Sequence, residues 1–302
     1  MPIKIKIGTR ESQLALWQAE FVKKQLSEIG VESELVLIKS DGELNLTSPL
    51  YEMGVQGIFT KALDIALLQK EIDIAVHSLK DVPTQLAKGL QLAAIPKRGN
   101  HKDVLVYKNT LPDNQLNYTV ATSSLRRSAQ WLHRYKTHKT EVLRGNINTR
   151  IKKLNNNQNW HGAMFAAAGI ERINLDVPNI LELDWMISAP AQGALGIVAR
   201  TESKEILEIC KNLNDNITEI ETTFERAFLR KLMGGCSMPI GGFASIKNEE
   251  LKFTGCVLTI NGEKMSKVEV VGNINNSENL LKEALEKLLD NGGAEILESF
   301  NK

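Results

Sequence analysis

Arginines recur where the sequence predicts that a strand has just ended or that a helix is beginning. In an open α/β sheet the carboxyl ends of the strands line the ligand crevice, and helix N-termini add N–H groups that favour anions. A guanidinium group can hold a carboxylate or a phosphate through two parallel hydrogen bonds. A single arginine is usually a solvated surface charge, but seven at equivalent positions predict a ligand with many anionic groups. They are Arg10, Arg98, Arg126, Arg127, Arg144, Arg150 and Arg172.

A polar turn after an apolar strand supplies a second set of candidates. Lys80 and Asp81 follow the predicted strand at 73–78, and catalytic groups commonly emerge at this end of a strand. A loop ion pair or a cap on the next segment explains the same spacing equally well. His77 lies on the strand and has no second ligand at metal spacing, so we interpret it as a core residue and predict no metal site.

Cys236 lies in a Gly-Gly-Cys loop after a predicted helix, where a thiol can be presented for reaction. A lone cysteine is more often a small buried hydrophobe, and packing explains Cys210 on an apolar helix and Cys256 in a strand. Three cysteines this far apart exclude a disulfide framework and a CxxC-type zinc site. They indicate a reducing compartment.

The elements that position these residues alternate between strands and helices, which predicts parallel α/β sheets. The segments IGTRESQLALW and VATSSLRRSAQW share one design, in which a strand and a threonine precede serine and arginine at a helix start. We interpret this repetition as a sign of two similar α/β lobes. From about residue 216 the pattern changes to a helix, three strands with a hairpin turn at Asn261-Gly262, and a final helix. That order predicts a small antiparallel α+β domain.

The overall charge and the hydrophobic runs of the chain indicate which classes of binding partner are disfavoured. The 302 residues include 37 Lys and Arg against 36 Asp and Glu, so the net charge is +1, and nothing in the overall charge favours nucleic acid or an anionic membrane. The longest nearly apolar run, 162–170, is far too short to span a bilayer. Residues 3–7 alternate like a strand and lack the apolar core of a signal peptide. We expect a cytoplasmic protein.

Eight segments occur in an order and spacing that resemble the hydroxymethylbilane synthase (porphobilinogen deaminase) family, from residue 7 to about 243. They are IGTRESQLALWQA, DIAVHSLKDVP, ATSSLRR, LRGNINTR, AAAGIERI, APAQGAL, FERAFLRKL and GGCSMPIGG. The resemblance implies an α/β fold with two periplasmic-binding-protein-like, doubly wound lobes and a small C-terminal α+β domain with a three-stranded antiparallel sheet. The expected bounds are 1–97 with 194–212 for the first lobe, 100–188 for the second and 216–302 for the third domain.

The activity implied by the resemblance is that of a transferase of tetrapyrrole (haem-type) biosynthesis. It condenses four porphobilinogen units head to tail, releases ammonia from each, and hydrolyses off the linear hydroxymethylbilane. The polypyrrole chain grows on a dipyrromethane cofactor bound by a thioether to Cys236, and Asp81 is the implied catalytic residue. We expect a monomer without metal, nucleic-acid or membrane partners.

The resemblance also implies two sets of binding residues, which share Arg144. The cofactor set is Cys236, Lys80, Asp81, Thr122, Ser123, Ser124, Arg126, Arg127 and Arg144. The set for substrate and growing chain is Arg10, Ser12, Ser78, Arg98, Arg144, Arg150, Arg172 and Gln192.

Three positions depart from the usual pattern of the family. Gln56 stands in the glycine-rich segment 42–57, which we expect to be a lid and which typically carries a lysine at this place. Asn148 and Ala191 stand where a glycine is common, and we expect both to be tolerated.

Two other classes of protein fit part of the pattern. A non-catalytic solute receptor would also combine two α/β lobes with arginines, but the missing signal peptide and the domain of Cys236 count against it. An enzyme acting on phosphates or nucleotides is disfavoured because the chain has no GxGxxG or GxxxxGK[ST] loop.

Overall fold

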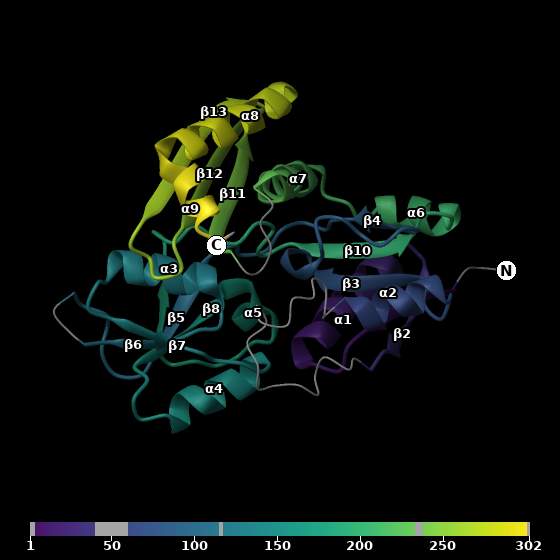
Figure 1. The fold of residues 1–302 in the computed structure, drawn as a ribbon. Coiled ribbons are helices and arrows are strands. Elements are labelled where there is room, and N and C mark those ends of the chain that lie inside the picture. The colour runs from purple at the N-terminus through teal and green to yellow at the C-terminus, as the bar shows by residue number, and fades with distance from the viewer. Residues whose placement is uncertain (1–3, 40–59, 115–116, 233–237, 301–302) are drawn as a thin grey trace.

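Three β-sheets with helices packed against them make up the part of the chain that the structure describes (Figure 1). This computed structural model describes residues 4–39, 60–114, 117–232 and 238–300. The predicted lid at 42–57 and the loop of Cys236 lie outside these ranges. Within them, no helix has the length and apolar character needed to cross a membrane.

The first sheet has the strand order β2-β1-β3-β10-β4. Its strands are β1 (Lys4–Thr9), β2 (Glu32–Leu37), β3 (Ile74–Ser78), β4 (Leu90–Ala94) and β10 (Leu195–Arg200). Its helices are α1 (Gln13–Glu28), α2 (Lys61–Leu68) and α6 (Lys204–Lys211). Alternate residues Ile5 and Ile7 of β1 share one buried cluster with Val22 and Leu26 of α1, so the period-two strand and the amphipathic helix bury each other.

The second sheet has the order β7-β6-β8-β5-β9. Its strands are β5 (Asp103–Tyr107), β6 (Thr119–Ala121), β7 (Lys139–Glu141), β8 (Gly162–Ala166) and β9 (Ile180–Glu182). Its helices are α3 (Leu125–Arg134), α4 (Ile147–Asn156) and α5 (Ala167–Arg172). On one face, Val104, Ala163 and Phe165 share a buried cluster with Leu154 of α4.

The two sheets repeat one topology, as the paired sequence motifs predicted. In each, three neighbouring strands are parallel (β2-β1-β3 and β7-β6-β8), and the last two pair antiparallel (β10-β4 and β5-β9). The expectation of parallel sheets is therefore wrong for one strand in each sheet, β10 or β5, which runs antiparallel to both of its neighbours. The reason is that β5 and β10 come from the chain crossing between the lobes, not from a strand–helix–strand unit.

The third sheet is antiparallel, with the order β11-β12-β13. Its strands are β11 (Ile240–Lys247), β12 (Glu250–Leu258) and β13 (Met265–Asn273). The helices beside it are α7 (Asn216–Lys231), α8 (Ser277–Leu288) and α9 (Ala294–Glu298). Phe224 and Phe228 of α7 pack on Phe253 of β12, with ring centroids 4.9 and 4.7 Å apart. The predicted three-stranded α+β domain is confirmed.

Helix α7 lies between the third sheet and the first lobe (Figure 1). Its N-cap, Asp215, accepts a hydrogen bond from the Thr218 N–H at 2.8 Å. Asp215 N donates at 2.9 Å to the carbonyl of Ile95, which lies in the connection between β4 of the first lobe and β5 of the second. The start of the helix is thus fixed to the connection between the lobes. Its last residue, Lys231, precedes the segment of Cys236 in the sequence.

Candidate active site

A buried carboxylate, Asp103, organises the arginines predicted to hold the cofactor. Arg126 donates to both of its oxygens, at 2.6 and 3.1 Å, and Arg127 Nε donates to Oδ1 at 2.7 Å. Burial alone would raise the pKa of Asp103, but the two guanidinium groups outweigh burial and hold the pKa below its usual range. Asp103 is fully buried, so this carboxylate keeps two like charges side by side.

The turn before α3 explains why both arginines point inward. Ser124 is the N-cap of α3 and accepts from Arg127 N at 3.4 Å. Thr122 Oγ1 accepts from Ser124 N at 3.2 Å, and Ser123 Oγ donates to the carbonyl of Leu143 at 2.6 Å. The three predicted hydroxyl residues therefore shape the backbone that presents the arginines.

Gln192 joins groups from the two lobes. Its Oε1 accepts from Lys80 Nζ at 3.2 Å and from Arg127 Nη2 at 3.5 Å, while its Nε2 donates to Asp103 Oδ1 at 3.0 Å. Burial, with Arg127 nearby, lowers the pKa of Lys80 to about 8. An anion bound beside Lys80 would stabilise its charged form, so this cluster suits a carboxylate ligand.

Asp81 ends the short 3₁₀ turn η3 (Leu79–Asp81) that directly follows β3. It is exposed, and its negative charge acts on Lys80 and on Arg127 and Arg150 of the second lobe. Next to it, Ser78 Oγ accepts from Gln18 Nε2 at 2.9 Å. The structure thus brings the predicted catalytic carboxylate within electrostatic reach of arginines from the opposite lobe.

Arg144 and Arg150 belong to the second lobe, and no carboxylate of the described residues is a hydrogen-bond partner of either guanidinium group. Arg150 Nε donates to the carbonyl of Gly145 at 2.8 Å, and burial, with Arg127 nearby, lowers its pKa to about 10. Arg144 is 9% exposed, and its Nη1 is buried without a hydrogen-bond partner among the residues described. Because an unpaired buried N–H of a charged group is costly, a carboxylate ligand here would satisfy it.

The remaining predicted arginines differ in their surroundings. Arg98 forms a two-pronged pair with Glu225 of α7, at 2.7 and 3.1 Å, and its role toward substrate stays a prediction. Arg172 donates to the carbonyl of Gly193 at 2.6 Å, lies over the Trp17 ring at 5.4 Å, and has its pKa lowered to about 10 by burial. It therefore contacts α1 of the opposite lobe.

The start of α1 and the strand beside it carry the last predicted substrate residues. Ser12 caps α1 by accepting from Ala15 N at 3.3 Å. Burial, together with the charge of Arg10, lowers the pKa of His77 to about 3. His77 is buried, so its imidazole is neutral at physiological pH, in line with its interpretation as a core residue.

The two family-atypical residues are accommodated differently. Asn148 Nδ2 donates to Gln13 Oε1 at 2.7 Å, so this side chain links α4 of one lobe to α1 of the other. Ala191 has φ +62°, a left-handed conformation that favours glycine. Its N–H donates to Glu225 Oε2 at 2.5 Å, so the buried carboxylate of α7 holds the strained residue in place.

Two cysteines are packed in the interior. Cys210 and Cys256 are fully buried, and burial raises the pKa of each thiol to about 12. Neither thiol is an effective nucleophile at neutral pH. Cys236 lies outside the described residues, so its assignment stays a prediction.

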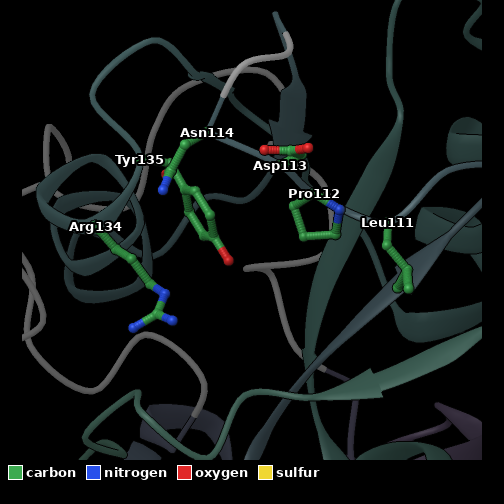
Figure 2. Close-up of a pocket in the computed structure, with 6 residues that line it drawn as sticks. All are labelled: Leu111, Pro112, Asp113, Asn114, Arg134 and Tyr135. Carbon is green, nitrogen blue, oxygen red and sulfur yellow. The ribbon is translucent and has the colours of Figure 1, made fainter.

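Within the described ranges there is no cluster of metal ligands, and two cavities lie away from the predicted site residues. No group of three or more His, Cys, Asp or Glu side chains there could hold a metal ion. A cavity of about 700 Å³ in the second lobe contains none of the predicted site residues (Figure 2). The residues around it are Leu111, Pro112, Asp113, Asn114, Arg134 and Tyr135.

Sequence reasoning missed three residues that build this site. Asp103 leads an otherwise apolar strand, DVLVY, which was the available signal. Glu225 and Arg226 lie inside FERAFLRKL, where their positions in a helical pattern are those of ordinary charged residues on a solvent-exposed helix face. Glu225 contacts Arg98, and Arg226 contacts the turn of Asp81. In each pair the two residues are more than 100 positions apart in the sequence, so no local pattern reveals these contacts.

Comparison with known proteins covers nearly the whole chain. The model of "Porphobilinogen deaminase, dipyromethane cofactor binding domain" matches residues 5–208, and that of "Porphobilinogen deaminase, C-terminal domain" matches residues 219–290. The chain is 40% identical to the porphobilinogen deaminase of Desulforamulus reducens over 304 residues, which is 99% of this chain and 98% of that protein. It is also 40% identical to that of Chlorobium phaeobacteroides over 312 residues, covering 100% and 99%.

Among solved structures, the methionine-binding protein MetQ is similar over 75% of this chain and 94% of that chain, with a TM-score of 0.44 and 13% identity. The family is shown by the sequence matches, because the two family models together span both lobes and the third domain. On that basis the chain belongs to the porphobilinogen deaminase family of transferases, and its first 200 or so residues form a dipyrromethane cofactor binding domain.

Proposed function

We propose that this chain joins four porphobilinogen units into hydroxymethylbilane on a dipyrromethane bound to Cys236. The observation that carries the proposal is that the negative charge of Asp81 acts on Lys80, Arg127 and Arg150 in a chain that matches the family over both lobes and the third domain. We further propose that the protein acts as a cytoplasmic monomer with the three domains bounded as the sequence predicts.

The donors present fit a cofactor rich in carboxylates. Lys80, Arg126 and Arg127 would hold its acetate and propionate groups, and the unpaired Nη1 of Arg144 would gain a partner. When bound, the dipyrromethane supplies the nucleophilic pyrrole carbon to which substrate is joined. Thr122, Ser123 and Ser124 act indirectly, because they fix the turn from which the two arginines project.

Asp81 would promote the release of ammonia from porphobilinogen. Departure of the amine leaves a cation delocalised over the pyrrole ring, and a carboxylate near the ring N–H lowers the energy of that charge as it develops. Joining the rings would release the proton of the attacking carbon. After four units, hydrolysis would break the bond between the cofactor and the methylene of the first unit, with hydroxide added to that methylene and the proton returned to the cofactor carbon. The negative chain grows by an acetate and a propionate at each step, which suits Arg144 and Arg150.

Product analysis tests the proposed function. Purified protein given porphobilinogen should release hydroxymethylbilane, with four ammonia molecules for each bilane. A solute receptor would bind porphobilinogen and return it unchanged. Recovery of all the porphobilinogen after long incubation with folded protein would therefore overturn the proposal.

Arg150→Ala should stall elongation instead of blocking every step equally. Loss of a charge-assisted hydrogen bond to a partly buried carboxylate costs roughly 1.5–3 kcal/mol, or about ten- to a hundred-fold in a rate. Intact mass after a brief pulse of porphobilinogen should show more protein carrying partial chains. Arg150→Lys should rescue poorly, because an ammonium group cannot form the two-pronged contact.

The matched control is Lys152→Ala, an exposed cation on the same helix. It should give the wild-type distribution of masses. A wild-type distribution in Arg150→Ala as well would leave Arg150 without this role.

A further inference from the structure

Arg226 of α7 binds the backbone of the turn that carries Asp81. Its Nη1 donates to the carbonyl of Val82 at 2.8 Å and to that of Leu79 at 3.3 Å, and its Nη2 donates to the carbonyl of Pro83 at 2.7 Å. The three acceptors lie on both sides of Asp81 in the sequence. One guanidinium group from the third domain thus binds backbone carbonyls before and after Asp81 in the proposed catalytic turn.

Besides Arg226, the turn is held by the packing of Leu79 and Val82 in one buried cluster and by few backbone hydrogen bonds. It is a single 3₁₀ turn closed by the Val82 N–H to Leu79 O bond at 3.1 Å, and Leu79 N donates to Ala194 O at 3.0 Å. Turns this short have little stability of their own. Hydrogen bonds from a charged donor are stronger than neutral ones, so the contacts of Arg226 weigh heavily in fixing this backbone.

The helix turn that carries Arg226 is fixed in position by its neighbour, Glu225. Glu225 is fully buried, pairs with Arg98, and accepts from the N–H groups of Ala191 and Ala244 at 2.5 and 2.8 Å. Arg98 lies in the connection between β4 and β5, Ala191 in the connection between β9 and β10, and Ala244 in β11. Two consecutive residues of α7 therefore tie the third domain to the lobe connections and to the Asp81 turn.

We propose that Arg226 is a positioning residue that sets the place of the Asp81 carboxylate from the third domain. This inference rests on the proposed function, in which Asp81 stabilises the cation. Helix α7 also leads in sequence toward Cys236, so one helix connects the proposed tether to the catalytic turn.

The test compares Arg226→Met, which keeps an apolar stem but removes the donors, with Arg230→Met, an exposed arginine on the same helix. Arg226→Met should still gain the covalent cofactor mass and keep its KM, whereas kcat should fall about ten- to a hundred-fold, because small misplacement of a catalytic group costs on that scale. Arg226→Lys should recover part of kcat. Arg230→Met should match the wild type in all three measurements.

Two further measurements separate positioning from a general loss of structure. Hydrogen exchange at the Val82 amide should speed up in Arg226→Met but not in Arg230→Met. In the Asp81→Ala background, removing Arg226 should cost no further activity, since it acts through Asp81. An unchanged kcat in Arg226→Met, or an equal loss in both backgrounds, would overturn the inference. Faster exchange at Val82 in Arg226→Met, together with a wild-type protein that makes no bilane, would refute only the proposed function.

Discussion

Cys236→Ser should yield protein of unmodified mass that makes no hydroxymethylbilane. The wild type should exceed its sequence mass by two porphobilinogen units less their two ammonia molecules, because the thioether retains both rings. A serine hydroxyl is a far weaker nucleophile than a thiolate at neutral pH, so the bond should not form. Intact-protein mass and bilane release from the same samples give the two readouts.

The other two cysteines supply matched controls. Cys210→Ala and Cys256→Ala remove thiols that burial keeps protonated, with each pKa raised to about 12. Both variants should retain the added mass and the activity per folded molecule, although each leaves a small cavity in the core. An unmodified wild-type protein that still releases bilane would show that no cysteine tether exists.

The lobes were predictable because their local patterns repeat. A strand and a threonine followed by a capping serine, with an arginine within two residues of that serine, occur at Thr9 with Ser12 and again at Thr122 with Ser124, and both serines cap helices in the structure. These signals lie within a few residues of one another, so sequence alone contains them. The antiparallel strands β5 and β10 were not predictable in the same way, since their direction follows from chain crossings between distant segments.

The site was predictable to the extent that it consists of arginines near strand ends. The sequence grouped Arg126 and Arg127 with Lys80, and the structure brings all three around Gln192 and Asp103. It did not reveal that Arg98 pairs with Glu225, because a guanidinium has the same sequence signature whether its partner is a ligand or a buried carboxylate. Only the fold decides between them.

Asp81 also shows why charge balance has to be considered for the whole site. Lys80, Arg126, Arg127, Arg144 and Arg150 bring five positive charges, and Asp103 neutralises one of them within the interior. In the proposed function, the positive excess would bind the polypyrrole carboxylates but would oppose formation of a cation in the same place. A carboxylate beside the reacting ring would therefore have to offset that field locally, and Asp81 is an exposed acid whose charge acts on Lys80, Arg127 and Arg150.

Asp81→Ala should consequently bind porphobilinogen but lose bilane formation on the order of a thousand-fold, the scale on which one group aimed at a developing charge contributes. Asp81→Asn, which keeps the shape and removes the charge, should be nearly as slow, whereas Asp81→Glu should keep a little activity because only the placement of the charge changes. Turnover is expressed per molecule that carries the covalent mass, so that poor cofactor loading is not counted as slow chemistry. Asp290→Ala, an exposed acid of the third domain, should turn over at the wild-type rate, and near-normal turnover in Asp81→Ala would assign the electrostatic role to another residue.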